Sequence, residues 1–149
     1  MAASRNVCLL LAMLIGYEAL APSQAFELSP VMKKQIAKLK TRCINQTGAS
    51  EERMLQAKQD EVLPDDAAFK CFLHCMFDMF GLIDSKNVMQ LEALIDVLPE
   101  EVHPKINELV GACGTQKGTD GCDTAYQTVK CYLNVNKEFI TQQIINSMQ

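Results

Sequence analysis

The chain has 149 residues, a length that predicts one domain, slightly shortened by processing. Its 14 basic and 18 acidic residues give a formal charge of −4 at pH 7, which argues against a nucleic-acid-binding surface, because such a surface needs clustered positive charge. With 48% hydrophobic and 21% charged residues the chain is globular rather than disordered, and two histidines leave little material for histidine-based catalysis.

The first 25 residues have the three parts of a secretory signal peptide. A basic start precedes the apolar run 7–16, and small residues follow it, so cleavage is expected before Phe26. The alternative is a transmembrane anchor, but a run of about ten apolar residues is too short for a span, which needs about 20. Cleavage would remove Cys8 and leave six of the seven cysteines. An even cysteine count in a secreted chain predicts a disulfide framework.

Capping residues, apolar spacing and helix breakers predict a series of short helices in residues 26–149. Ser29-Pro30 is typical of a helix start, while Gly81 and Pro99 are expected to end helices. The expected helices run over residues 30 to about 48, 51–58, 67–80, 87–98, 100 to about 113, and 120 to about 135. An apolar tail, 136–149, follows. Strand signals are scarce, so the predicted class is all-α, a compact bundle of six to seven short helices.

The six remaining cysteines restrict how the bundle can be cross-linked. They are Cys43, Cys71, Cys75, Cys113, Cys122 and Cys131. Cys71 and Cys75 lie one turn apart on one helix, which places their Cβ atoms about 5–6 Å apart, too far for a disulfide. Cys122 and Cys131 are separated by roughly 13 Å along another helix. Excluding both pairs leaves ten of the 15 possible pairings.

The cysteine spacing, the signal peptide and the all-helical pattern together resemble the six-cysteine odorant-binding proteins of insects. The paired spacings Cys71-x3-Cys75 and Cys113-x8-Cys122-x8-Cys131 carry the resemblance, which covers residues 26–149, and the segment 81–84 is also similar. The resemblance implies the bridges Cys43–Cys75, Cys71–Cys122 and Cys113–Cys131, one of the ten pairings left open above. It further implies that the bundle encloses an apolar cavity.

Apolar stripes on the predicted helices indicate where such a cavity would lie. The resemblance implies lining positions at Met76, Phe77, Leu91, Leu94, Ile95, Leu98, Ile106, Leu109, Val129 and Tyr132. The stripes and the tail add Phe80, Tyr126, Leu133, Phe139 and Ile140 as candidates. Ordinary core packing is the alternative interpretation of these residues. Tyr126 and Tyr132 are the candidates for a polar, ligand-orienting role, although each is equally compatible with a buried tyrosine bonded to the backbone.

The resemblance implies a secreted, non-enzymatic carrier that holds a small hydrophobic volatile, an odorant or pheromone, in sensillum fluid and delivers it to a chemoreceptor. No metal, cofactor, nucleic-acid partner or membrane span is expected, and the protein is expected to be a monomer or a homodimer. One alternative is a carrier of the same fold in saliva, reproductive fluid or haemolymph. Another is a secreted helical inhibitor or protein-interaction module.

Four local features add further expectations. His74 lies between Cys71 and Cys75, a spacing compatible with zinc, but an oxidising compartment favours disulfides and a solvent-facing histidine. His103 is expected to be an ordinary exposed histidine rather than a pH-sensitive group. Asn45 begins an N-glycosylation sequon. The tail 136–149 is either a lid over the cavity, which acid could open, or a loose terminus.

Overall fold

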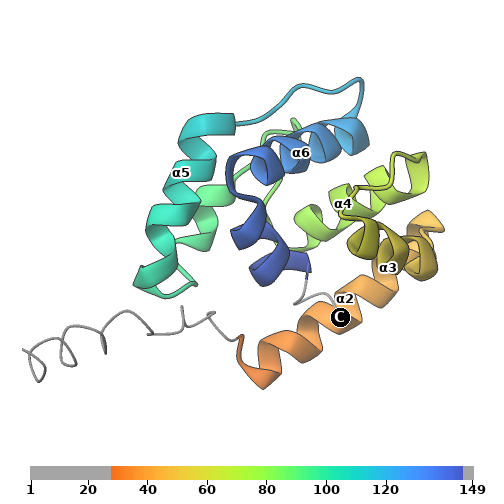
Figure 1. The fold of residues 1–149 in the computed structure, drawn as a ribbon, viewed down its shortest axis with the longest axis horizontal. Coiled ribbons are helices and arrows are strands. Elements are labelled where there is room, and N and C mark those ends of the chain that lie inside the picture. The colour runs from red at the N-terminus through yellow and green to blue at the C-terminus, as the bar shows by residue number, and fades with distance from the viewer. Residues whose placement is uncertain (1–27, 146–149) are drawn as a thin grey trace, which may run out of the picture.

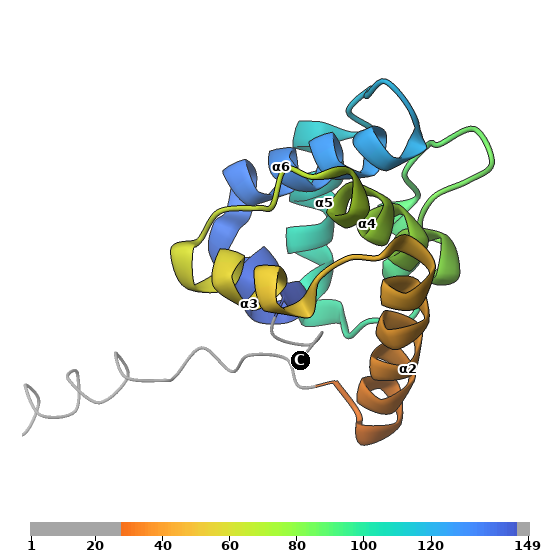
Figure 2. The ribbon, with the colours of Figure 1, turned by 90° about the vertical axis from the view of Figure 1, so that its right-hand side faces the viewer.

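The computed structural model describes residues 28–145, so the expected signal peptide lies outside the described residues. Figures 1 and 2 show short helices packed at steep angles to one another; in Figure 1, α2 and α3 lie on the right-hand and lower side and α5 on the left. The elements are α2 (Pro30–Thr47), α3 (Glu51–Asp60), α4 (Ala67–Met79), η2 (Leu91–Leu94), η3 (Glu100–Val102), α5 (His103–Cys113), α6 (Gly121–Phe139) and η4 (Ile140–Ile145). Over this range the fold is all-α, as predicted; its only β pairing is an isolated bridge between Ile83 and Met89.

Four of the helices begin at a side chain that caps them. Ser29, Ser50, Asp66 and Asp120 each accept a hydrogen bond from the backbone N–H three residues further on, at 2.8–3.3 Å. Such a bond satisfies one of the N–H groups that the first turn of a helix leaves without a partner. The helix starts predicted near these residues are therefore confirmed.

The helix expected over residues 87–98 does not form. Residues 81–90 instead make a loop in which the Asp84 carboxylate accepts hydrogen bonds from the N–H groups of Lys86 and Val88, at 2.8 and 2.9 Å. Asn87 has a positive φ of 61°, and the Met89 N–H donates to the Thr115 hydroxyl at 2.9 Å. The backbone also pairs across the loop, since the Asp84 N–H donates to the Val88 carbonyl and the Gln90 N–H donates to the Leu82 carbonyl, which holds this stretch out of the helical conformation. Only the short turn η2 remains of the prediction.

The tail continues the last helix after a break. Asn136 has non-helical angles (φ −148°, ψ 75°), close to where the sequence predicted the helix to end. Its side-chain oxygen accepts a hydrogen bond from the Phe139 N–H at 3.1 Å, and its amide donates to Glu108 of α5 at 3.3 Å. Lys137 forms an ion pair with Glu61 at the end of α3. The described part of the tail is thus attached to two other helices.

Three disulfides connect the helices. Cys43–Cys75 joins α2 to α4, Cys71–Cys122 joins α4 to α6, and Cys113–Cys131 joins α5 to α6. This is the pairing that the resemblance implied. Together the bridges link four helices into one covalent framework, and each is worth about 2–4 kcal/mol of stability.

Candidate functional site

An apolar interior lies where α4, α5, α6 and the tail meet. Leu109 of α5 is completely buried, and Ile140 of the tail is 1% exposed. Of the 15 predicted ligand-contacting residues, the buried ones, which we call the floor, are Met76, Leu91, Ile106, Leu109, Tyr126, Val129, Tyr132 and Ile140. The half-buried ones packed against them, which we call the rim, are Phe77, Leu94, Ile95, Leu98, Leu133 and Phe139. The structure therefore gathers 14 of the predicted residues into one cluster.

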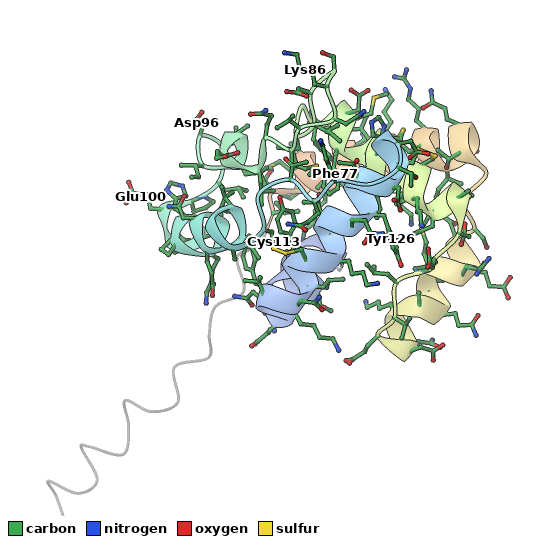
Figure 3. All side chains as sticks on the ribbon, turned by 90° about the horizontal axis from the view of Figure 1, so that it is seen from above. Phe77, Lys86, Asp96, Glu100, Cys113 and Tyr126 are labelled. Atoms are coloured by element: carbon green, nitrogen blue, oxygen red, sulfur yellow. A yellow bond between two sulfur atoms is a disulfide. The ribbon has the colours of Figure 1, made fainter. Side chains whose placement is uncertain are left out.

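Phe80 does not belong to this cluster. Its side chain is 41% exposed, whereas Phe77, one turn earlier, packs against the core. Helix α4 ends at Met79, and the chain turns away at Gly81, whose φ is 68°. Phe80 still donates its N–H to the Met76 carbonyl, but it is the last residue before this turn, so its side chain lies at the exposed end of the helix. Figure 3 shows Phe77 toward the middle of the molecule, while Lys86 and Glu100 lie at its outer edge.

The two candidate tyrosines have different surroundings. Tyr132 lies in the floor, and its hydroxyl donates to the Gly114 carbonyl at a long 3.5 Å. Burial raises the pKa of Tyr132 to about 12, so its hydroxyl is a neutral donor at ordinary pH. Tyr126 is also a floor residue, but the Lys70 ammonium lies over its ring, 4.7 Å from the ring centroid. Of the two, Tyr132 is the one with a weakly held hydroxyl group inside the apolar interior.

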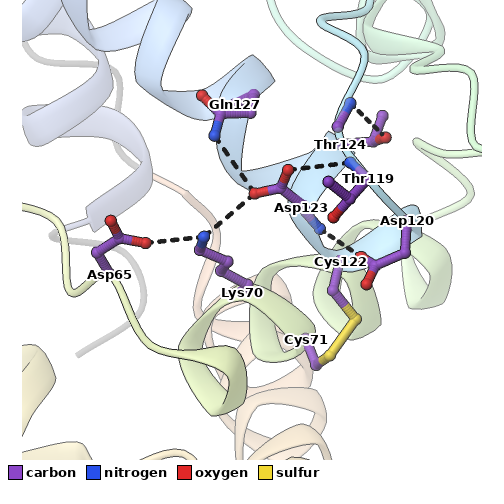
Figure 4. A network of polar contacts seen from close by, with 10 residues as sticks. Asp65, Lys70, Cys71, Thr119, Asp120, Cys122, Asp123, Thr124 and Gln127 are labelled. Carbon is purple, nitrogen blue, oxygen red and sulfur yellow. Dashed lines mark hydrogen bonds and ion pairs between the residues drawn. A yellow bond between two sulfur atoms is a disulfide. The ribbon is translucent and has the colours of Figure 1, made fainter.

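A polar network covers the outer side of the α4–α6 contact, where Lys70 forms ion pairs with Asp65 at 2.8 Å and Asp123 at 3.1 Å (Figure 4). The Thr119 N–H and the Lys70 ammonium hold the pKa of Asp123 below its usual range. Lys70, Thr119 and Asp123 of this network line a surface depression of about 350 Å³ beside the Cys71–Cys122 bridge. The network fastens α4 to the first turn of α6.

Neither this depression nor a second one is part of the apolar interior. The second, of about 420 Å³, lies between the 81–90 loop and residues 115–124. None of the 15 predicted ligand-contacting residues lines either depression. Lysine, aspartate and threonine side chains border both depressions, which distinguishes them from the apolar floor and rim.

Both histidines differ from expectation, since each is half-buried and hydrogen-bonded. His74 Nε2 lies 3.1 Å from the side-chain oxygen of Asn87. Gly121 lies beside this pair, and a β-carbon on Gly121 would collide with both side chains. His103 Nε2 lies 2.8 Å from the Leu98 carbonyl. Because the cysteines that flank His74 form disulfides, they are not zinc ligands. Asn45, in contrast, is exposed on α2.

Several residues of the interior were not among the 15 predicted ligand-contacting residues. Phe72 is buried and stacks against Phe69 with ring centroids 6.2 Å apart. The spacing of Phe69, Phe72 and Met76 on one helical face was a usable signal. Ile83 and Met89 are also buried in the core, but they come from the 81–90 loop. No periodic pattern identifies the inward residues of such a loop.

The sequence and the fold both match known proteins. The model of the PBP/GOBP family matches residues 25–135. General odorant-binding protein 69a of Drosophila melanogaster is 56% identical over 142 residues, covering 95% of this chain and 96% of that protein. The crystal structure of the medfly Odorant Binding Protein CcapOBP22/CcapOBP69a has a TM-score of 0.72 and 37% identity, covering 77% of this chain and 98% of that one.

A mosquito structure is similar to the same degree. Odorant Binding Protein 7 from Anopheles gambiae, with four disulfide bridges and in complex with an azo compound, has a TM-score of 0.72 and 32% identity, covering 82% of this chain and 95% of that one. Among the described residues of our chain, no helix is both long and apolar enough to cross a membrane. The chain therefore belongs to the PBP/GOBP family of insect odorant-binding proteins, which are carriers of small ligands.

Proposed function

We propose that this protein is a secreted, non-enzymatic carrier that binds a small hydrophobic volatile among the floor and rim residues and delivers it to a chemoreceptor. The observation that carries the proposal is the gathering of 14 predicted residues, from α4, η2, α5, α6 and the tail, into one apolar cluster. The expected signal peptide, residues 1–25, supports secretion into sensillum fluid or a similar secretion.

Binding is driven by removal of ligand and rim surface from water. The rim side chains are only half-buried, so a ligand that covers them gains apolar contact. A volatile of about 15 heavy atoms, at about 0.5 kcal/mol per atom, gains about 7–8 kcal/mol, which corresponds to roughly micromolar affinity. Such an affinity allows the ligand to be released again, as a carrier requires.

Tyr132 gives the site a polar group. Its hydroxyl makes a long bond to the Gly114 carbonyl, so a ligand oxygen is an attractive alternative acceptor. The mosquito relative is in complex with an azo compound, and the nitrogens of an azo group are hydrogen-bond acceptors. We therefore propose hydrophobic ligands that carry one acceptor, oriented by Tyr132.

The described tail closes the interior on one side. Ile140 is buried, and Phe139 belongs to the rim. The tail is attached through Asn136 to Glu108 and through Lys137 to Glu61, contacts that lie near the surface and are individually weak. We propose that this segment is the lid, and that the ligand enters when these contacts open.

Phe77 and Phe80 offer a matched test, because they are the same residue type three positions apart and only Phe77 packs against the core. The disulfide-bonded chain from residue 26 is titrated with an apolar fluorophore, which is then displaced with a panel of volatiles. We expect Phe77→Ala to weaken binding about tenfold, because it removes apolar contact, and Phe80→Ala to leave it within twofold. Phe77→Leu, which keeps most of the side-chain volume, should bind nearly as well as the unaltered protein.

Thermal unfolding of each variant separates loss of binding from loss of folding. The proposal fails if a chain with all three bridges intact shows no saturable displacement. It also fails if the two alanine variants weaken binding equally, since the ligand would then not be bound among the rim residues.

A further inference from the structure

Helix α2 carries a charge opposite to that of the rest of the chain. Its 18 residues hold five basic side chains and no acidic one. Residues 48–149 hold 8 basic and 16 acidic side chains, a net charge of −8. Such a charge asymmetry indicates a separate electrostatic surface. Neither the fold nor the proposed ligand site accounts for it.

The basic side chains form a row along the outer face of α2. Lys34, Lys38 and Arg42 follow one another at four-residue intervals, which places them on one face of the helix, and all three are exposed. Ile36 and Cys43, on the opposite face, are buried against the core. At 1.5 Å per residue the row is about 12 Å long. We call Lys34, Lys38 and Arg42 the basic row.

No ion pair with the basic row forms among the side chains that the structure describes. Among residues 28–142 the ion pairs of α2 are limited to Lys40, which contacts Glu51 at 3.1 Å. The other pairs, around Lys70, Arg53 and Lys137, lie on α4, α3 and α6. Both ribbon views show α2 at the edge of the molecule, with open space along its outer side. The three positive charges are therefore available to a partner.

We propose that the basic row is a docking site for an extracellular sulfated polysaccharide, whose sulfate groups lie along α2. The proposal rests on the secretion stated in the proposed function but not on the apolar interior. A linear polyanion fits because a single helix presents a narrow, convex row rather than a pocket. Charge-assisted hydrogen bonds from lysine and arginine to sulfate oxygens provide the attraction.

A membrane surface fits these observations less well. A helix that lies in a bilayer interface buries its apolar face in lipid, but the apolar face of α2 is already packed against the protein. The described outer face offers one exposed large apolar residue, Val31, at 67%. A flat anionic bilayer would also repel the acidic remainder of the domain within a Debye length of about 8 Å. A thin polymer, in contrast, contacts only α2.

The test compares two variants of equal charge. In the first, the basic row is neutralised; in the second, three exposed lysines on α5, the 114–120 loop and α6 are neutralised instead. The substitutions are Lys34→Gln, Lys38→Gln and Arg42→Gln against Lys105→Gln, Lys117→Gln and Lys130→Gln. Each mature, disulfide-bonded protein is titrated with a heparin octasaccharide at several salt concentrations, and fluorophore binding is measured in parallel.

We expect the octasaccharide to bind the unaltered protein, and the basic-row variant to bind at least tenfold more weakly with a salt dependence reduced by about two to three released ions. The control variant should bind within twofold. Equal weakening by both variants would overturn the proposal, because octasaccharide binding would then depend on the net charge of the protein and not on the basic row. The proposal would also be overturned if the unaltered protein bound phosphatidylserine vesicles, or single-stranded DNA of the same length, more tightly than the octasaccharide. Absence of any octasaccharide binding would overturn it as well. Unchanged fluorophore binding in every variant shows that any such failure leaves the carrier function intact.

Discussion

Gly118 is the position where one added methyl group should damage the fold most clearly. It lies in the loop between α5 and α6, against the first turn of α6. A β-carbon there would lie 2.4 Å from the backbone nitrogen of Thr124 and 2.5 Å from the carbonyl carbon of Asp123. Both atoms belong to the helix backbone, so neither can move aside alone. Gly118→Ala must therefore displace the loop from the helix.

The displacement destabilises the protein because it crowds the loop and breaks two hydrogen bonds. Overpacking by one methyl group costs about 1–3 kcal/mol where side chains can adjust. The bonds at risk run from the N–H groups of Gly118 and Thr119 to the side chains of Thr124 and Asp123, and both are 3.0 Å long. At about 1 kcal/mol per bond, partly replaced by water, the free energy of unfolding should fall by about 2–4 kcal/mol.

Gly111 is the matched control. It lies in α5, and a β-carbon there would have no atom within 4 Å. Gly111→Ala should raise the free energy of unfolding by about 0.5–1 kcal/mol, because alanine loses less conformational entropy in a helix. Urea unfolding of both oxidised variants measures the two changes, with midpoints moving in opposite directions. A Gly118→Ala protein as stable as the unaltered one would refute the loop–helix contact, and destabilisation by Gly111→Ala would refute its open surroundings.

Three further predictions concern the tail, the floor and the 81–90 loop. Ile140→Ala should lower the free energy of unfolding by about 2–4 kcal/mol in urea, since Ile140 is buried; a decrease below about 0.5 kcal/mol would mean that the tail is not part of the core. Tyr132→Phe should weaken fluorophore displacement by carbonyl-bearing volatiles about threefold to tenfold and leave hydrocarbons of equal size unaffected, and equal effects on both classes would remove the proposed polar role. Hydrogen bonds, the strongest from the Val88 N–H, lower the pKa of Asp84. The ionised Asp84 carboxylate therefore stabilises the fold above about pH 4, and this stabilisation is lost as pH falls through the lowered pKa. Asp84→Asn should therefore make stability fall less steeply below pH 4, and an unchanged slope would contradict this.

Helix starts were predictable because their cause is local. Ser29, Ser50, Asp66 and Asp120 each stand beside the N–H groups that they cap, so the sequence contains the whole interaction. The failed helix at 87–98 shows the opposite case. Its apolar spacing suits a helix, but the Gln90 N–H donates to the Leu82 carbonyl across the loop, and the Met89 N–H donates to Thr115, 26 residues away. A contact between segments that distant leaves no periodic trace in the sequence.

Membership of the interior was predictable for helical residues and failed at a helix end. The period of α4 directs Met76 and Phe77 toward the core, as expected, and the error at Phe80 arises because the helix stops one residue before it. Helix boundaries are uncertain by a few residues, so residues at the boundary carry the largest errors of orientation. The disulfide pairing was beyond geometric reasoning, which left ten alternatives. It followed only from the resemblance.

Net charge illustrates how an average can hide a separate surface. A formal charge of −4 argues against a polyanion-binding protein when the chain is taken as a whole. A partner, however, experiences charges only within a Debye length of about 8–10 Å, whereas a domain of this size is roughly 30–40 Å across. The relevant quantity is thus the charge of each face. The four-residue spacing of Lys34, Lys38 and Arg42 places them on one helical face, and only the structure shows that all three are exposed while the opposite face is buried. A prediction of partners from charge therefore needs the fold first.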